Sequence, residues 1–221
     1  MATIEDFGIE RGEVFLSSFG IWTADLVPLG DAVLSEGQRV TIVVGDLSLS
    51  GTIVAGAVLA DSSGVRVVGG AGGWRKSIAR KAYRDNENGV KLASVVADLA
   101  RETGETVDVA DSLRGAVLGA AWTRPEGTAA EALDVLGKPW RVRPDGVTEL
   151  GPLATRQASG IVSLRSYAPG HRRAIVEFPD DEVSSVLPGT VLDLAEDLSL
   201  TVRTATITIT SGTIRGRIVG T

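Results

Sequence analysis

The run Leu200-Thr-Val-Arg-Thr-Ala-Thr-Ile-Thr-Ile-Thr210 decides the fold class, because apolar residues alternate in it with Thr and Arg. A period of two places successive side chains on opposite faces, which is typical of a strand with one buried face. The following run, Ile214-Arg-Gly-Arg-Ile218, alternates in the same way. Long strands of this kind expose edges that aggregate unless they close into a barrel or pair with another chain. The end of the chain therefore predicts a sheet or barrel wall and hints at assembly.

Similar runs fill the rest of the last third and the whole of the first third. Val, Ile, Leu and Thr dominate them, and Gly, Asp and Ser separate them at turns. They cover 14–16, 20–27, 39–44, 48–59 and 64–68, and then 161–164, 173–178, 191–193, 198–210 and 213–219. Within 39–55 the pair Gly45-Asp46 separates two of the runs, which predicts a hairpin with one wet face.

The middle of the chain contains helical patterns instead. From 91 to 103 the apolar residues recur at the spacing of one helix face, and Gly104 marks the end. Thr128 and Glu131 form a capping-box pattern that predicts a helix to about Leu136. A hairpin then follows over 139–150 around Pro144-Asp145-Gly146. The middle third is therefore predicted to be α/β.

A glycine-rich run, Gly69-Gly-Ala-Gly-Gly73, lies between the first β-region and this middle part. Four glycines in five residues can cradle a phosphate, but Trp74-Arg75-Lys76-Ser77 follows without the spacing of a P-loop or a dinucleotide fingerprint. We interpret the run as a hinge or tight bend at a domain boundary. No convincing internal repeat is seen between the two β-regions, although divergent barrels need not display one.

Composition narrows the class of protein. The 221 residues include no Cys, which excludes disulfides, thiolate metal sites and cysteine nucleophiles. The net charge of −6 argues against a surface that holds nucleic acid by neutralising many phosphates. The acidic start of the chain and the lack of a long apolar run predict a cytoplasmic product without a signal peptide or membrane span.

Candidate catalytic groups are few. The one histidine, His171, lies in a turn-like stretch beside Arg172 and Arg173, and no nucleophile elbow precedes it. The acids Asp180-Asp181-Glu182 lack calcium-loop spacing and are interpreted as a solvated loop. The acid pairs Glu102 with Glu105 and Asp108 with Asp111 are interpreted as helix surface and helix-cap signals. We therefore expect a protein that is not an enzyme, with no catalytic, metal or cofactor-binding residue and no cofactor.

A basic segment is the best candidate for a binding surface. It consists of Trp74, Arg75, Lys76, Arg80, Lys81 and Arg84, with Tyr83 among them. Interleaved rings and cations can stack bases and track phosphates, but Asp85 and Glu87 balance the charge nearby. We interpret the segment as a suspected interface and keep nucleic-acid binding as the alternative.

The four tryptophans leave a related alternative open. An exposed ring in a β-domain can hold carbohydrate, whereas a buried ring packs the core or an interdomain contact. We favour packing for Trp22, Trp74, Trp122 and Trp140. A β-rich carbohydrate- or nucleic-acid-binding module remains the alternative function.

The order of these segments resembles the baseplate or tail hub proteins of tailed phages, a fold shared with type VI secretion spike proteins. The resemblance runs from about Thr41 onward and rests on spacing and small motifs. The segments that carry it are 72–83, 88–101, 124–133, 140–146 and the stretch Leu187-Pro-Gly-Thr190.

The resemblance implies a fold and a function. It implies an α+β, mainly β fold with two β-barrel regions, 1–72 and 153–221, flanking a small α/β insert, 73–152. It also implies a homotrimeric ring at the phage tail tip or baseplate, joining the tail tube to the spike and letting DNA pass without specific binding. The partners would be tail tube, distal tail and spike or tip proteins, in a virion assembled in the host cytoplasm.

Overall fold

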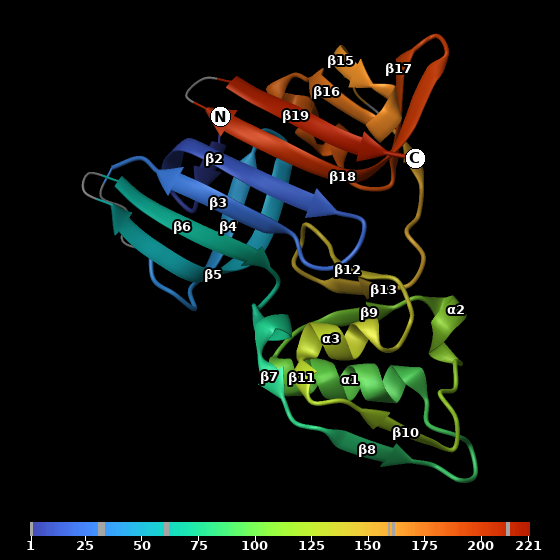
Figure 1. Cartoon of the computed structure of the whole chain (residues 1–221). Coiled ribbons are helices and arrows are strands. Elements are labelled where there is room, and N and C mark those ends of the chain that lie inside the picture. The colour runs from blue at the N-terminus through green and yellow to red at the C-terminus, as the bar shows by residue number, and fades with distance from the viewer. Residues whose placement is uncertain (1, 31–33, 60–61, 159, 161, 211–212) are drawn as a thin grey trace.

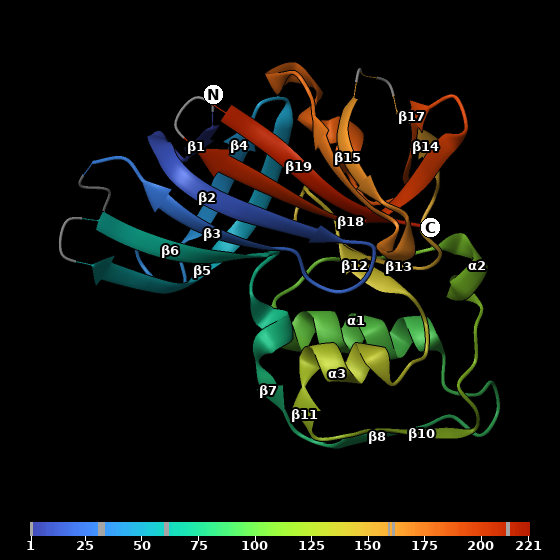
Figure 2. The same cartoon turned by 45° about the horizontal axis from the view of Figure 1, so that its top comes forward.

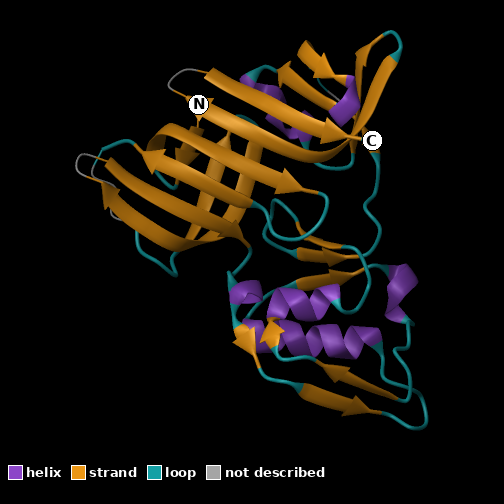
Figure 3. Cartoon of the chain, in the orientation of Figure 1, coloured by secondary structure: helices purple, strands orange, loops and turns teal. Residues whose placement is uncertain are grey.

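The computed structural model describes residues 2–30, 34–59, 62–158, 160, 162–210 and 213–221. Strands dominate the chain, and its α-helices gather in the middle third (Figure 3). This confirms the predicted mainly β, α+β class with barrel regions around an α/β insert. Ile161, where one predicted strand begins, lies outside the described residues.

The first third closes into a six-stranded β-barrel (Figure 1). Its strands are β1 (Ala2–Ile4), β2 (Phe7–Ser17), β3 (Thr23–Pro28), β4 (Arg39–Val44), β5 (Leu47–Leu59) and β6 (Ser62–Gly69). Antiparallel pairing runs in the order β1-β2-β3-β6-β5-β4 and returns from β4 to β1. Val40, Ile42 and Val44 are buried because alternate residues of β4 point inward. The hairpin predicted around Gly45-Asp46 is confirmed as β4 and β5.

The sequence-based strands omitted β1 and the first half of β2. Glu and Asp interrupt the pattern at the turn between these strands, where Glu5 has a φ of 50°. The Glu5 carboxylate accepts a 2.6 Å hydrogen bond from the Thr41 N–H of β4. Cross-strand pairing with β4, which the local sequence does not display, therefore fixes this part of the chain as strand.

The last third forms a second set of six strands. They are β14 (Arg156–Gln157), β15 (Ser163–Ala168), β16 (Arg173–Glu177), β17 (Thr190–Ala195), β18 (Leu198–Thr210) and β19 (Thr213–Gly220). Two 3-10 helices, η2 (Pro169–His171) and η3 (Asp180–Val186), lie between them. The pairing runs β15-β16-β19-β18-β17-β14, and no ladder joins β14 to β15 within the described part of the chain. The second barrel is therefore less completely closed than the first.

The two barrels share one continuous sheet. β18 pairs with β17 through its N-terminal half and with β2 through Thr204 to Ile209. β18 and β2 lie side by side in both views of the molecule (Figures 1 and 2). The outer face of the first barrel thus continues across the junction into the second.

Strands β2 to β6 and β15 to β19 are arranged as a repeat, although the sequence displays no convincing one. Both barrels have the same strand order, with β2 to β6 corresponding to β15 to β19, but β14 runs parallel to β17 whereas β1 runs antiparallel to β4. From Arg39 to Gly69, strands β4, β5 and β6 have the same lengths as β17, β18 and β19 at a constant offset of 151 residues, so that Arg39 corresponds to Thr190. Eight of these 31 positions carry identical residues at that offset, including Asp46-Leu-Ser-Leu49 and Asp197-Leu-Ser-Leu200. The match was too short to recognise before the structure aligned the strands.

The middle third forms the α/β insert at the lower end of Figure 1. Its helices are η1 (Gly73–Arg75), α1 (Leu92–Thr103), α2 (Asp111–Arg114) and α3 (Ala129–Asp134). Its strands are β7 (Ser77–Ile78), β8 (Lys81–Arg84), β9 (Val107–Val109), β10 (Ala121–Arg124), β11 (Gly127–Thr128), β12 (Trp140–Val142) and β13 (Thr148–Leu150). The helix predicted over 91–103 and the capping box at Thr128 are confirmed. The second helix ends at Asp134, two residues earlier than predicted.

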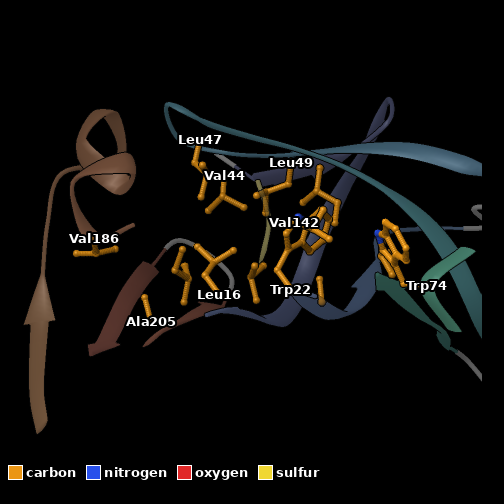
Figure 4. Close-up of a cluster of buried hydrophobic side chains, with 14 of the residues drawn as sticks. Leu16, Trp22, Val44, Leu47, Leu49, Trp74, Val142, Val186 and Ala205 are labelled. Carbon is orange, nitrogen blue, oxygen red and sulfur yellow. The ribbon is translucent and has the colours of Figure 1, made fainter. Parts of the chain in front are cut away.

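A single core joins the three parts (Figure 4). Leu16, Trp22 and Ala205 from the barrels lie in one buried cluster with Val142 of the insert. The Trp22 indole Nε1–H donates a 3.1 Å hydrogen bond to the Arg143 carbonyl, and the Ser50 N–H donates to the Pro144 carbonyl. The insert therefore packs against the first barrel. The division of the chain into domains at 1–72, 73–152 and 153–221 stays a prediction.

Candidate assembly interface

The basic segment divides between core and surface. Trp74 is buried, and its Nε1–H donates a 2.7 Å hydrogen bond to the Thr148 hydroxyl. Its ring therefore contributes to the core and is not available to a partner at the surface of this chain. The five cations of the segment are exposed.

Two of these cations already have partners within the chain. Lys76 Nζ donates to the Thr103 carbonyl at 3.1 Å, at the end of α1. Lys81 Nζ lies 2.5 Å from the carboxylate of Asp98 on α1. Arg75, Arg80 and Arg84 make no ion pair with any described residue. They are the free charges of the suspected interface, and their role there stays a prediction.

Tyr83 is held by the same carboxylate. Its hydroxyl donates a 2.7 Å hydrogen bond to Asp98, and its ring lies 5.8 Å from that of Trp122. The hydrogen bond from Lys81, helped by that from Tyr83, holds the pKa of Asp98 below its ordinary value. Burial and the hydrogen bond to Asp98 raise the pKa of Tyr83 to about 12. The ring that sequence reasoning offered for base stacking is thus engaged in packing the β8–β10 ribbon onto α1.

The glycine run is a bend whose backbone donors are already taken. Gly70 and Gly72 have φ values of 76° and 75°, which other residues rarely adopt. The Glu105 carboxylate accepts hydrogen bonds from the N–H groups of Ala71 at 2.9 Å and Gly73 at 2.6 Å. The tight bend is confirmed, and these two donors are occupied by the chain's own acid instead of a phosphate.

This contact corrects the interpretation of Glu105 as helix surface. Glu105 is only 7% exposed, because the chain turns inward after Gly104. Its neighbour Glu102 pairs at 2.7 Å with Arg124, which is 1% exposed. Sequence reasoning missed both pairs because their partners lie 22 or more residues away.

The residues considered for catalysis do not gather into a site. His171 is exposed in η2, and the acids 180–182 begin η3 on the surface. Within the described ranges no three His, Asp or Glu side chains lie close enough to hold a metal ion. Nor is any helix there long and apolar enough to cross a membrane.

Most tryptophans are buried, as the packing interpretation predicted. Trp22, Trp74 and Trp140 are 1%, 0% and 3% exposed, and the rings of Trp74 and Trp140 lie 6.0 Å apart. Trp122 is half-buried. Three of the four rings therefore cannot stack on a sugar at the surface.

The outer face of the shared sheet carries paired charges. Arg66 of β6 contacts Asp25 of β3 at 2.7 Å, and Arg217 of β19 contacts Glu13 of β2 at 3.3 Å. The second pair crosses the junction between the barrels. A shallow groove of about 660 Å³ lies over this junction and is lined mainly by β2, β3, β6, the C-terminal half of β5 and the end of β18.

These features define the class. A closed six-stranded barrel and a second six-stranded set with the same strand order, joined in a continuous sheet and flanking an α/β insert, form a fold like that of phage tail and baseplate hub proteins.

Solved structures show this fold with little sequence identity. The 43 kDa tail protein of prophage MuSo2 from Shewanella oneidensis is similar with a TM-score of 0.70 and 9% identity, over 98% of this chain and 95% of that one. A tail protein from Neisseria meningitidis MC58 has a TM-score of 0.64 and 13% identity, over 98% and 94%.

A secretion component is similar as well. The E. coli c3393 protein has a TM-score of 0.65 and 12% identity over 100% of this chain and 77% of that one. It is described as a type VI secretion component with structural similarity to the T4 tail proteins gp27 and gp5. No family model matches the sequence, and no curated protein matches it.

Proposed function

We propose that this chain is a structural component of a phage tail, located at the tail tip or baseplate. The observation that carries the proposal is the shared architecture, which covers 98% of this chain and 95% of the MuSo2 tail protein. Its solved relatives are tail proteins and a secretion component, which fits a role other than catalysis.

The finer proposal is a ring-forming hub. Each chain contributes two barrels with the same strand order, so a homotrimer presents six similar units around its axis. A ring of this kind would join a tail tube on one side to spike or tip proteins on the other. Its assembly would take place in the host cytoplasm before incorporation into the virion.

The proposed ring would let DNA pass without binding it. The arginines on β6 and β19 of the shared sheet are each paired with an acid. Phosphate binding requires cations that can release their counterions on contact. If the outer face of this sheet lines the lumen, these paired arginines would offer DNA little to hold, and Arg11 of β2 would be an exposed cation there without an ion pair among the described residues.

The test is the native mass of the concentrated protein together with class-averaged electron micrographs. We expect a mass of three chains and open rings. A persistent monomer across all concentrations, with no rings in the micrographs, would contradict the hub and leave only the tail fold.

The alternative is a β-rich carbohydrate- or nucleic-acid-binding module. Burial of three tryptophans weighs against the carbohydrate form. The three unpaired arginines at 75, 80 and 84 are the observation that keeps the nucleic-acid form testable.

A further inference from the structure

At the junction between the two barrels, two strands pair that have different numbers within their own barrels. Within the chain, β2 is the second strand of the first repeat and β18 is the fifth strand of the second. They pair antiparallel, with Phe15 opposite Thr206. The second position of one repeat thus joins the fifth position of the next.

Each chain also carries one more strand at the second position, β15, and one more at the fifth position, β5. Neither takes part in the junction between the barrels. β15 is the second strand of the second repeat, and among the described strands it bonds only to β16. β5 is the fifth strand of the first repeat, and β4 pairs with it only as far as Thr52. Ile53 exchanges backbone hydrogen bonds with Gly37 and Gln38. Beyond Ile53, the hydrogen bonds between β5 and described strands come from β6. Among the described residues these two edges therefore have no strand partner, and the neighbour beside Gly56 is the Leu34 carbonyl, 3.9 Å from where a Cβ would lie.

We propose that β15 of one copy pairs antiparallel with the C-terminal half of β5 of a second copy, as β2 pairs with β18 within the chain. The occupant of the edge is a second copy because the chain itself contains the complementary strand. This inference rests on the proposed ring and specifies the contact that closes it. Unpaired edges favour such strand addition, and a head-to-tail contact that uses two different edges generates a ring when the rotation closes.

The repeat also fixes the register of the new pair. Ala55 and Thr206 correspond, because each lies opposite the arginine of its hairpin, Arg66 or Arg217. Ala168 and Phe15 correspond, because each lies opposite the first residue of the next strand, Arg173 or Thr23. Since Phe15 faces Thr206, Ala168 of one copy faces Ala55 of the other, and Tyr167 faces Gly56.

The side chains at this contact suit a close approach. Ala55, Gly56 and Ala168 are exposed in the single chain. Their small size leaves the strand edges accessible, and the pair Ala55 and Ala168 buries no charge. Opposite residues of an antiparallel pair have Cα atoms about 4.5–5.5 Å apart, which is within the range of a disulfide.

Cysteine cross-linking tests the contact and its register, because the natural chain contains no cysteine. We would make Ala55→Cys, Ala168→Cys and the double variant, and oxidise each with copper phenanthroline at high protein concentration. We expect the mixed single variants to give covalent dimers, and the double variant to give higher covalent oligomers that end at the ring. Each single variant alone should stay at least tenfold less cross-linked.

Two cross-linking results would overturn the inference. Efficient dimers of Ala168→Cys alone would show that β15 pairs with itself, and no cross-link in the mixture or the double variant would remove the β15–β5 contact. If micrographs of the wild-type protein still show rings in that case, the hub proposal stands and only the strand pairing fails. If neither rings nor cross-links form, both fail.

A charge swap provides a second measurement with a matched control. Ala55→Glu with Ala168→Glu places like charges opposite each other, whereas Ala55→Lys with Ala168→Glu places opposite ones. Both residues are exposed, so each double variant should fold with an unchanged melting temperature. We expect the first to lower the ring fraction at least tenfold relative to the second, and equal ring fractions would contradict the contact.

Discussion

Glu105 connects the insert to the bend at the end of the first barrel. A buried acceptor of two backbone N–H groups is costly to remove, because the donors lose their partner without regaining water. We expect Glu105→Ala to lower the free energy of unfolding by about 2–4 kcal/mol and Glu105→Gln by about half as much. Urea unfolding measures both.

The matched control for Glu105 is Glu126→Ala, because Glu126 is exposed and has no partner among the described residues. Its effect should stay within about 0.5 kcal/mol. Equal effects of Glu105→Ala and Glu126→Ala would show that Glu105 does not hold the bend.

Tyr83 makes the ribbon of the insert sensitive to alkali. Its pKa is raised to about 12, and the ordinary value near 10 applies to the unfolded chain. A raised folded pKa means that the native state keeps a proton that the unfolded state loses. The stability from this contact is therefore complete below about pH 10 and is lost as the pH rises toward 12.

Absorbance at 295 nm checks the titration of Tyr83. We expect a phenolate transition near pH 12 that Tyr83→Phe removes and that Asp98→Asn moves to lower pH, since the aspartate accepts the phenol's hydrogen bond. A Tyr83→Phe variant with an unchanged transition would contradict the assignment.

At the scale of the element, a pair of glycines in β5 and β6 makes room for Trp22. Gly51 lies opposite Gly69, and a Cβ at Gly69 would lie 2.5 Å from the Trp22 Nε1 atom. We expect Gly69→Ala to cost about 1–3 kcal/mol through overpacking. The same change at Gly115, where nothing lies within 4 Å and φ is −88°, should be neutral or slightly stabilising. Thermal unfolding separates the two, and a harmless Gly69→Ala would contradict the packing.

The alternation of β18 predicts opposite outcomes for adjacent residues. Ile207 is fully buried, and a carboxylate there would have no partner, at a cost comparable to the stability of a whole domain. We expect Ile207→Asp to give insoluble or unfolded protein. Thr208 is exposed between Glu13 and Arg215, so Thr208→Asp should fold. Circular dichroism of the soluble fractions measures this, and a folded Ile207→Asp would contradict the assignment of the strand.

At the scale of the whole molecule, the charge is divided unevenly between the parts. Residues 1–72 contain three Lys or Arg and nine Asp or Glu, whereas the remainder is balanced. We expect no binding to single- or double-stranded DNA at about 0.15 M salt. Fluorescence anisotropy with labelled DNA tests this.

The nucleic-acid alternative predicts the reverse result. Binding would fall steeply with salt and disappear in the triple variant Arg75→Ala, Arg80→Ala, Arg84→Ala. This variant removes only exposed cations without described partners, so its folding should not change.

Much of the secondary structure follows from local sequence. The alternation in β18, the helical period of α1 and the capping box at Thr128 each depend on residues within a few positions. The bend at Gly70 and Gly72 follows from backbone freedom in the same way. These features required no knowledge of distant partners.

The sequence by itself therefore determined the mainly β fold class, the hairpins around Gly45-Asp46 and Pro144-Asp145-Gly146, and the helices α1 and α3. Only the tertiary structure decided that strands β2 to β6 and β15 to β19 repeat one arrangement, that β2 joins β18, and that Glu105 occupies the glycine bend. The physical reason is the separation along the chain over which each interaction acts. Periodicity and capping act between near neighbours along the chain, whereas strand pairing across 190 residues and the burial of an ion partner depend on which surfaces meet after folding.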